Sequence, residues 1–143
     1  MDQKREAEQV DGTWFTYFNK IVPTIFTDEV CNRYVQSLEQ IYGDFFGRNL
    51  RPASGPLISL GAGFGMTEIP LARKGYTVIG IDNDRQVLEL LRTNAVNYGM
   101  NRVTAKFGDL YTDFHQEFVG TGIQACISFG TLEHFSKLIP VSC

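Results

Sequence analysis

Three glycines at alternate positions, Gly61, Gly63 and Gly65, directly follow an apolar run at 57–60. Glycine permits positive φ and lets a ligand approach the backbone, and the start of a following helix exposes amides that have no internal partner. Tight turns from a strand into a helix are often glycine-rich for structural reasons alone. The turn therefore indicates a ligand only if other residues suited to the same ligand stand at matching positions.

One such residue is Asp82, which follows a second apolar run, at 76–81. It stands 21 positions after Gly61, where a carboxylate can accept hydrogen bonds from both hydroxyls of a ribose. The alternative role of Asp82 is to cap the next helix. Because Asn83 or Asp84 could cap that helix equally well, we expect Asp82 to be free for the ribose.

A second acidic residue follows the third apolar run, at 103–107. Asp109 could accept a hydrogen bond from the amino group of adenine, while Leu110 packs against the ring. Taken alone, Asp109 would be interpreted as a solvated loop residue. Its position after a strand, in series with the glycine turn and Asp82, is what favours adenosine recognition.

The spacing of the glycines indicates which kind of nucleotide to expect. Dinucleotide-binding turns usually have their last glycine at the sixth position of the motif, where the pyrophosphate meets the helix. Met66 occupies that position here. The pattern therefore disfavours flavin and nicotinamide cofactors and favours a ligand without a pyrophosphate.

The elements that must position these residues alternate between strand and helix. Continuous apolar runs predict buried strands at 57–60, 76–81, 103–107 and 123–129, and helical spacing predicts helices at 66–74 and 84–97. This alternation predicts a doubly wound, Rossmann-like α/β fold, with a parallel sheet of strand order 3-2-1-4 that is covered on both faces. Ligands of such sheets bind at the carboxyl ends of the strands, where the residues above fall.

Residues 1–50 are predicted to form a helical cap, and residues 51–143 a partial nucleotide-binding domain in the same structural unit. Thr27 can cap a helix whose apolar positions include Leu38 and Ile41 and extend to Phe45. Before it lies an aromatic cluster that could either close over a ligand or pack against the sheet edge. Its candidate lid residues are Trp14, Tyr17 and Phe18.

Together these motifs resemble the class I S-adenosylmethionine-dependent methyltransferases. The segment LISLGAGFGMTEIPLARKGYTVIGIDND at 57–84 is similar to the first two motifs of that family, and ISFGTLEHF at 127–135 is similar to its motif after the fourth strand. The resemblance implies S-adenosylmethionine as the cofactor and in-line transfer of its methyl group. The net charge of −3 favours a small molecule as the acceptor.

The resemblance also assigns roles to individual residues. The glycine turn would bind the methionine portion of the cofactor, Asp82 the ribose, and the backbone after the fourth strand would pass beneath the sulfonium. The implied cofactor-binding residues are Gly61, Ala62, Gly63, Gly65, Asp82, Asn83, Asp109, Leu110, Ser128, Phe129 and Gly130. Glu133 and His134 are candidate general bases for the acceptor, or they simply begin the next helix.

Two departures from the family pattern stand out. Many members have an acidic residue where this chain has Ser59, which we expect to weaken the network that fixes the glycine turn and the cofactor's amino group. The sequence also ends before the fifth strand and the antiparallel pair of the family, so we expect the fourth strand to lie at an open edge. A truncated product, a fragment, or completion by a second copy or another chain would each explain this end.

Composition narrows the remaining alternatives. A net charge of −3 without a basic patch argues against nucleic acid and anionic membranes as partners, and no apolar run predicts a signal or a membrane span, so a cytoplasmic protein is expected. The three cysteines and two histidines lack metal-site spacing, so we expect reduced thiols and no metal. Two competing hypotheses stay open: a non-catalytic cofactor-binding subunit, and an NAD-dependent oxidoreductase.

Overall fold

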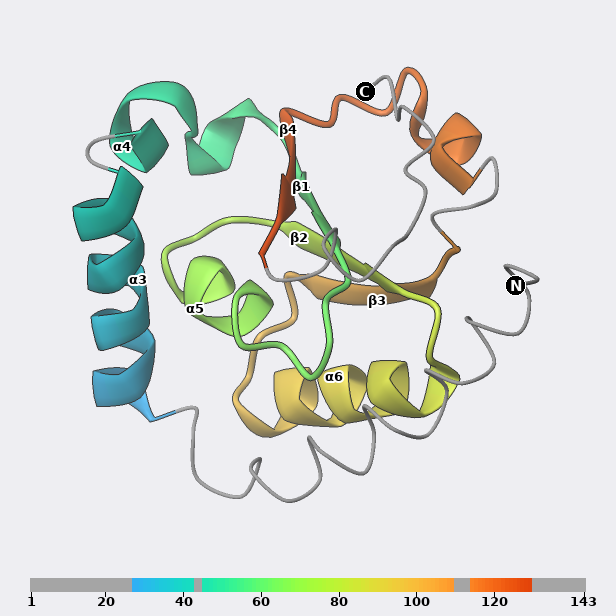
Figure 1. Cartoon of the computed structure of the whole chain (residues 1–143), viewed down its shortest axis with the longest axis horizontal. Helices are drawn as coiled ribbons and strands as arrows, with labels where there is room; N and C mark the ends of the chain where they lie inside the picture. The colour runs from blue at the N-terminus through green and yellow to red at the C-terminus, as the bar shows by residue number, and fades with distance from the viewer. Residues whose placement is uncertain (1–26, 43–44, 110–113, 130–143) are drawn as a thin grey trace, which may run out of the picture.

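Four parallel strands form one sheet in the order β3-β2-β1-β4 (Figure 1). The structure, a computed structural model, describes residues 27–42, 45–109 and 114–129. The strands are β1 (Leu57–Leu60), β2 (Val78–Asp82), β3 (Val103–Phe107) and β4 (Ala125–Ser128). The predicted topology is confirmed. β2 begins two residues later than predicted and includes Asp82, and β4 is shorter than predicted at both ends.

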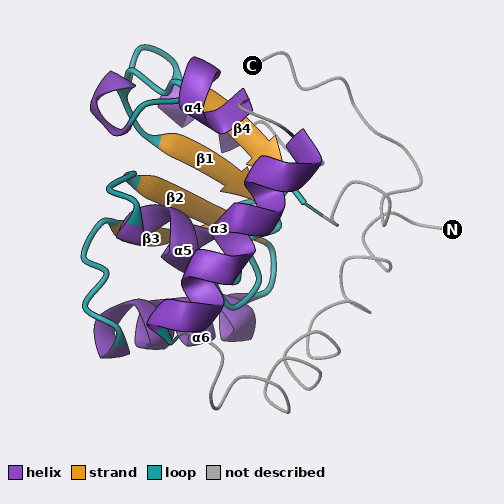
Figure 2. Ribbon diagram, turned by 90° about the vertical axis from the view of Figure 1, so that its left-hand side faces the viewer, coloured by secondary structure: helices purple, strands orange, loops and turns teal. Residues whose placement is uncertain are grey.

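The helices that connect the strands lie on one face of the sheet (Figure 2). They are α5 (Glu68–Arg73) between β1 and β2, and α6 (Arg85–Asn97) between β2 and β3. Leu88 and Leu91 of α6 pack with Ala62 against β3, as expected of right-handed crossovers that bury one apolar stripe of each helix.

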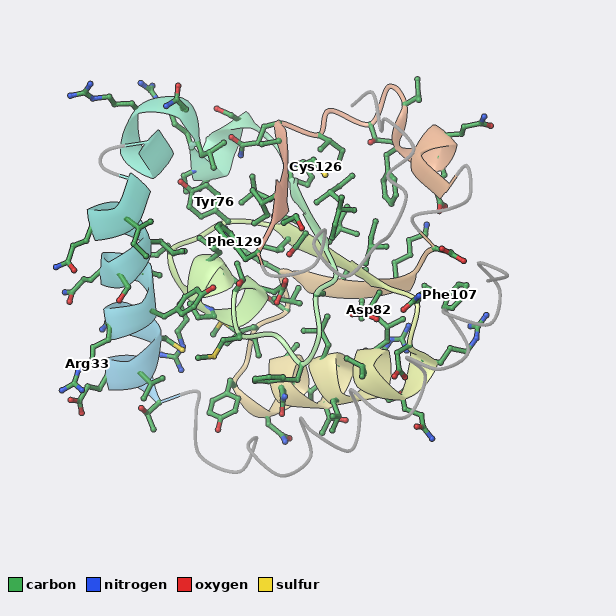
Figure 3. The ribbon with its side chains drawn as sticks, in the orientation of Figure 1. Arg33, Tyr76, Asp82, Phe107, Cys126 and Phe129 are labelled. Atoms are coloured by element: carbon green, nitrogen blue, oxygen red, sulfur yellow. The ribbon has the colours of Figure 1, made fainter. Side chains whose placement is uncertain are left out.

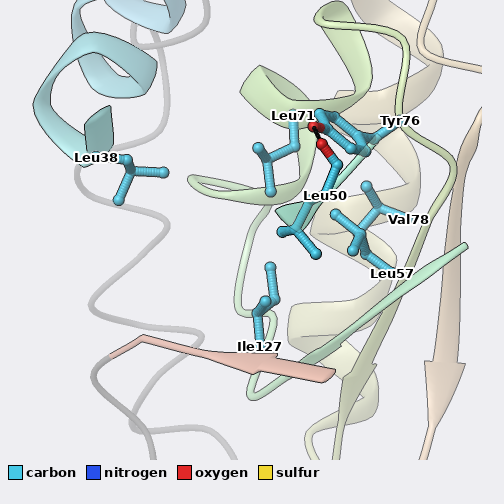
Figure 4. Packing of buried hydrophobic residues seen from close by; sticks show 7 residues of the cluster. All are labelled: Leu38, Leu50, Leu57, Leu71, Tyr76, Val78 and Ile127. Atoms are coloured by element: carbon cyan, nitrogen blue, oxygen red, sulfur yellow. Dashed lines mark hydrogen bonds between the residues drawn. The ribbon is translucent and has the colours of Figure 1, made fainter. Parts of the chain in front are cut away.

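Preceding the sheet are α3 (Asp28–Tyr42), α4 (Phe45–Asn49) and a 3₁₀ turn, η2 (Pro52–Ser54). Leu38 of α3 belongs to a buried cluster with Leu71 of α5 and three residues of the sheet (Figure 4). In the same cluster, the hydroxyl of Tyr76 donates a hydrogen bond to the carbonyl of Leu50. The sheet residues of this cluster are Leu57, Val78 and Ile127. These contacts join α3 to the core of the sheet.

The start of α3 agrees with its sequence, whereas its buried face does not. The amide of Val30 donates to Thr27 Oγ1 at 3.3 Å, which is the predicted cap. Ile41, predicted on the apolar face, is 71% exposed, because the buried stripe runs through Cys31, Val35 and Leu38 and Ile41 lies about a quarter turn from its centre. The helix also ends at Tyr42 rather than continuing to Phe45, and α4 follows as a separate element.

The opposite face of the sheet is covered by the chain that leads into β4. A second 3₁₀ segment, η3 (Phe114–Phe118), places Phe118 against the buried residues Ile58, Leu60 and Ile81, together with the half-buried Ile123. Among the helices that the structure describes, none combines the length and apolar character that crossing a membrane requires.

Candidate cofactor site at the carboxyl ends of the strands

The carboxyl ends of β1, β2 and β4 meet at one edge of the sheet. Leu60, the last residue of β1, is in register with Ile81 on one side and with Ser128 on the other. The glycine turn begins at the next residue, Gly61. The register therefore brings together the turn, the end of β2 and the end of β4, as the sequence predicted.

All three glycines of the turn have positive φ, at 67° for Gly61, 59° for Gly63 and 108° for Gly65. Side chains rarely adopt this conformation, so the turn itself requires glycine. At Gly65 space is also restricted, because an added Cβ would lie 2.8 Å from the side chain of Leu91 on α6. The turn thus packs closely against α6 at Gly65.

Backbone amides of the turn are held by the end of β2. The amides of Gly61 and Ala62 donate to the carbonyl of Ile81 at 2.7 and 3.0 Å. The amide of Gly63 donates to Asp82 Oδ2 at 3.0 Å. These three bonds fix the turn before any ligand binds, which reduces the entropy that binding must remove.

Asp82 is less free than its sequence position predicted. Besides the bond from Gly63, its carboxylate accepts a hydrogen bond from the amide of Asp84, with 3.0 Å between that nitrogen and Oδ1. The capping part of the prediction holds, because Asp84 Oδ1 accepts the amides of Gln86 and Val87 at the start of α6. Burial raises the pKa of Asp82, and the amide of Gly63 followed by that of Asp84 opposes this rise.

Asp82 and the end of β3 form a second part of the site. Asp82 pairs with Phe107 in register, so the two labelled residues belong to neighbouring strands (Figure 3). The amide of Gly108 donates a hydrogen bond to the Asp82 carbonyl at 3.0 Å. The guanidinium carbon of Arg85 lies 3.9 Å from the centroid of the Phe107 ring, which is 41% exposed. Asp109, half-buried, lies two residues after Phe107, so both predicted carboxylates lie at neighbouring strand ends.

Asn94 supports the turn from α6 and was not predicted. Its side-chain amide donates to the carbonyl of Phe64 at 3.0 Å, and the residue is 5% exposed. An asparagine on the apolar face of a helix is a signal that sequence reasoning can use, because a buried amide needs a partner. Here that partner is the backbone of the glycine turn.

Ser59 and Glu68 form a buried polar pair beneath the turn. Ser59 Oγ donates to Glu68 Oε1 at 2.5 Å, and the two residues are 3% and 1% exposed. Burial raises the pKa of Glu68 from 4.5 to about 7, against the opposing effect of the Ser59 hydroxyl. The sequence had indicated only that a carboxylate is missing at Ser59. The structure places one beside the Ser59 hydroxyl, from the first residue of α5.

The end of β4 completes the described site. Ser128 is half-buried, and no hydrogen-bond partner for its buried hydroxyl occurs within the described residues. Phe129 packs against the cluster around Leu57 and Ile127. The other predicted site residues lie outside the described part of the chain: Leu110, Gly130, Glu133, His134, Trp14, Tyr17 and Phe18.

No protein-family model matches the sequence, and neither does any curated protein sequence. Solved structures do match the fold. One is the magnesium protoporphyrin IX methyltransferase of Synechocystis PCC 6803 with bound S-adenosylhomocysteine, with a TM-score of 0.66, 19% identity, and coverage of 94% of this chain and 61% of that one.

A second match is a candidate S-adenosyl-L-methionine-dependent methyltransferase from Methanococcus maripaludis, with a TM-score of 0.56, 16% identity, and coverage of 80% of this chain and 55% of that one. The chain thus spans little more than half the length of either structure. At these identities the likeness is one of fold, and it agrees with the observed strand order.

Proposed function

We propose that this chain, which has the fold of the class I methyltransferases, binds S-adenosylmethionine at the carboxyl ends of its strands and transfers the methyl group to a small molecule. The link between Gly63 and Asp82 carries the proposal. It joins the glycine turn, suited to the methionine portion, to a carboxylate suited to the ribose. A carboxylate has about four acceptor sites, and Asp82 uses two of them on amides, so acceptors remain for ribose hydroxyls.

The chain's contribution to the reaction would be binding and orientation. When bound, S-adenosylmethionine would supply a methyl group activated by its positive sulfonium, for in-line transfer to the acceptor with the thioether as leaving group. The preset turn and the backbone carbonyls at the end of β4 would hold the cofactor in place, which is the main requirement for such a transfer. Glu133 and His134 are our proposed bases for a protonated acceptor, and Trp14, Tyr17 and Phe18 our proposed lid.

Met66 argues against the alternative of an NAD-dependent oxidoreductase. This side chain packs with Phe64, Ile69 and Cys31, so the position contributes to the core. A dinucleotide site usually has glycine there, where the pyrophosphate meets the helix. A small acceptor, rather than nucleic acid, is supported by the net charge of −3.

The test is calorimetric titration of the full chain with S-adenosylmethionine, S-adenosylhomocysteine and NAD. We expect saturable binding of the two adenosyl ligands and none of NAD. Asp82→Asn should lower the affinity for both adenosyl ligands by roughly tenfold or more, because an amide offers one acceptor oxygen where the carboxylate offers two. Asp28→Asn is the matched control, since that side chain is 82% exposed on α3. NAD binding, or no adenosyl binding by a folded sample, would refute the proposal.

Catalysis and assembly need separate measurements. Methyl transfer to a panel of small acceptors should fall in Glu133→Ala or His134→Ala while cofactor affinity is kept, if either residue is the base. Binding without transfer to any acceptor would favour a non-catalytic subunit. Mass measurement in solution would show whether a second copy is bound and so could cover the free side of β4, which pairs only with β1 among the described strands.

A further inference from the structure

Glu68 has a carboxylate oxygen that lacks a partner in an otherwise well-bonded region. Oε1 accepts the hydroxyl of Ser59, whereas Oε2 is buried and has no hydrogen-bond partner in the described part of the chain. No ion pair of Glu68 is found there either. Leaving a buried charged oxygen without a donor is costly, so such an atom in a native structure calls for an explanation, and a ligand, an ion or a water is one.

The position of Glu68 connects this oxygen to the glycine turn. The side chain lies over β1 and β2, where Ser59 and Gly80 are neighbours in register. A Cβ on Gly80 would lie 3.6 Å from Glu68 Cγ and 2.8 Å from the Cβ of Ala62, which belongs to the turn. The missing side chain at Gly80 therefore makes room for Ala62 of the turn and for Leu91 of α6, and Glu68 lies beside them at van der Waals distance.

The charges around Glu68 favour a cation. Burial raises its pKa to about 7, the nearby charge of Asp82 raises it further, and the Ser59 hydroxyl with the amides of Glu68 and Thr67 opposes the rise. From α3, Tyr34 contributes only its hydroxyl, which hydrogen-bonds to Thr67 at 2.6 Å. Nothing positive in the described surroundings balances the ionised carboxylate.

We propose that Glu68 is the recognition residue for the ammonium group of the cofactor's methionine portion, with Oε2 accepting from that group or from a water it holds. The inference rests on the proposed function, because it assigns the turn to S-adenosylmethionine. Ser59 orients the carboxylate through Oε1. The anionic partner for the amino group thus comes from the first turn of α5 rather than from β1.

The test compares two ligands that share the adenosine. S-adenosylhomocysteine has the ammonium group, and 5′-methylthioadenosine lacks the whole amino-acid portion. In Glu68→Gln, affinity for S-adenosylhomocysteine should fall roughly tenfold or more, the effect of losing a charged hydrogen bond, while that for methylthioadenosine stays unchanged. Glu89→Gln, an exposed glutamate on α6, is the control and should change neither affinity.

A second readout uses the unaltered chain, in case the variant does not fold. The ratio of the two affinities should rise on the order of tenfold between about pH 5.5 and pH 7, because the ionised fraction of a group with pKa about 7 rises by about that factor. Asp82 acts on the shared adenosine, so its titration cancels in the ratio.

Equal loss of both ligands in Glu68→Gln, or a pH-independent ratio, would mean that Glu68 only supports the turn and would overturn the inference. Failure of the unaltered chain to bind either ligand would instead refute the proposed function. The two failures are therefore distinguishable.

Discussion

Replacing Glu68 by glutamine should stabilise the ligand-free protein, by an amount that grows with pH. Glutamine has nearly the same shape as glutamate and can keep the contact with Ser59 through its carbonyl oxygen. It removes the charge that burial disfavours. The expected sign is unusual for a substitution in a buried region, where most changes destabilise.

The magnitude follows from the pKa of Glu68. In the folded state the Glu68 carboxyl has a pKa of about 7, whereas in the unfolded chain it has the ordinary value of 4.5. Below 4.5 both states are protonated, so the carboxyl contributes no pH dependence. As pH rises from 4.5 to about 7, the free energy of unfolding falls by roughly 1.4 kcal/mol per pH unit, and it levels off above that range at a loss of about 3 kcal/mol.

The assay is urea unfolding of the unaltered chain and of Glu68→Gln at several values between about pH 5 and pH 8. The difference in unfolding free energy between the two should be small at the acid end and approach about 3 kcal/mol in favour of the variant at the alkaline end. Glu89→Gln, whose side chain is 70% exposed, should show no such trend. A difference that does not change with pH would refute the reasoning, because it would show that Glu68 does not titrate in this range.

Stability measurements on four further variants, one of them a control, test the architecture around the site. Gly80→Ala should lower unfolding free energy by about 1–3 kcal/mol, because its methyl would meet carbon atoms at 2.8 Å, whereas Gly47→Ala, on a helix with open space around it, should raise it by about 0.5–1 kcal/mol. Asp84→Ala should cost about 1 kcal/mol by removing the α6 cap, measured by chemical denaturation. Tyr76→Phe should lower unfolding free energy by about 1–3 kcal/mol in thermal unfolding, because the buried carbonyl of Leu50 loses its donor.

The strand order could be predicted because the signals are local and repeated. Each strand of the sheet is short and rich in apolar residues, glycine or an acidic residue lies at or near its end, and right-handed crossovers leave few ways to arrange four such strands. The face of α3 could not be predicted as well. Its sequence offers two overlapping apolar stripes, and contact with α5 and the sheet selects the one through Val35 and leaves Ile41 exposed.

The candidate site likewise contains residues that could be predicted from the sequence and residues that could not. The glycine turn and Asp82 are visible in sequence because each must stand at a strand end. Asn94 and Glu68 are not, because Asn94 bonds the turn from α6 and Glu68 bonds Ser59 of β1 from α5, and only the packing of each helix reveals these partners. A sequence signal does exist for both, namely a polar residue on a helix face that should be apolar, and it indicates burial without identifying the partner.

Packing alone does not account for the pair of Ser59 and Glu68. A serine and a glutamine would fill the same space without a buried charge, and ionised Glu68 should make the ligand-free protein less stable by about 3 kcal/mol at neutral to alkaline pH. A positively charged group bound at Oε2 would offset that loss only in the complex. The same interaction would then raise cofactor affinity and leave the ligand-free state under-stabilised, which is the usual relation between a functional buried charge and its ligand.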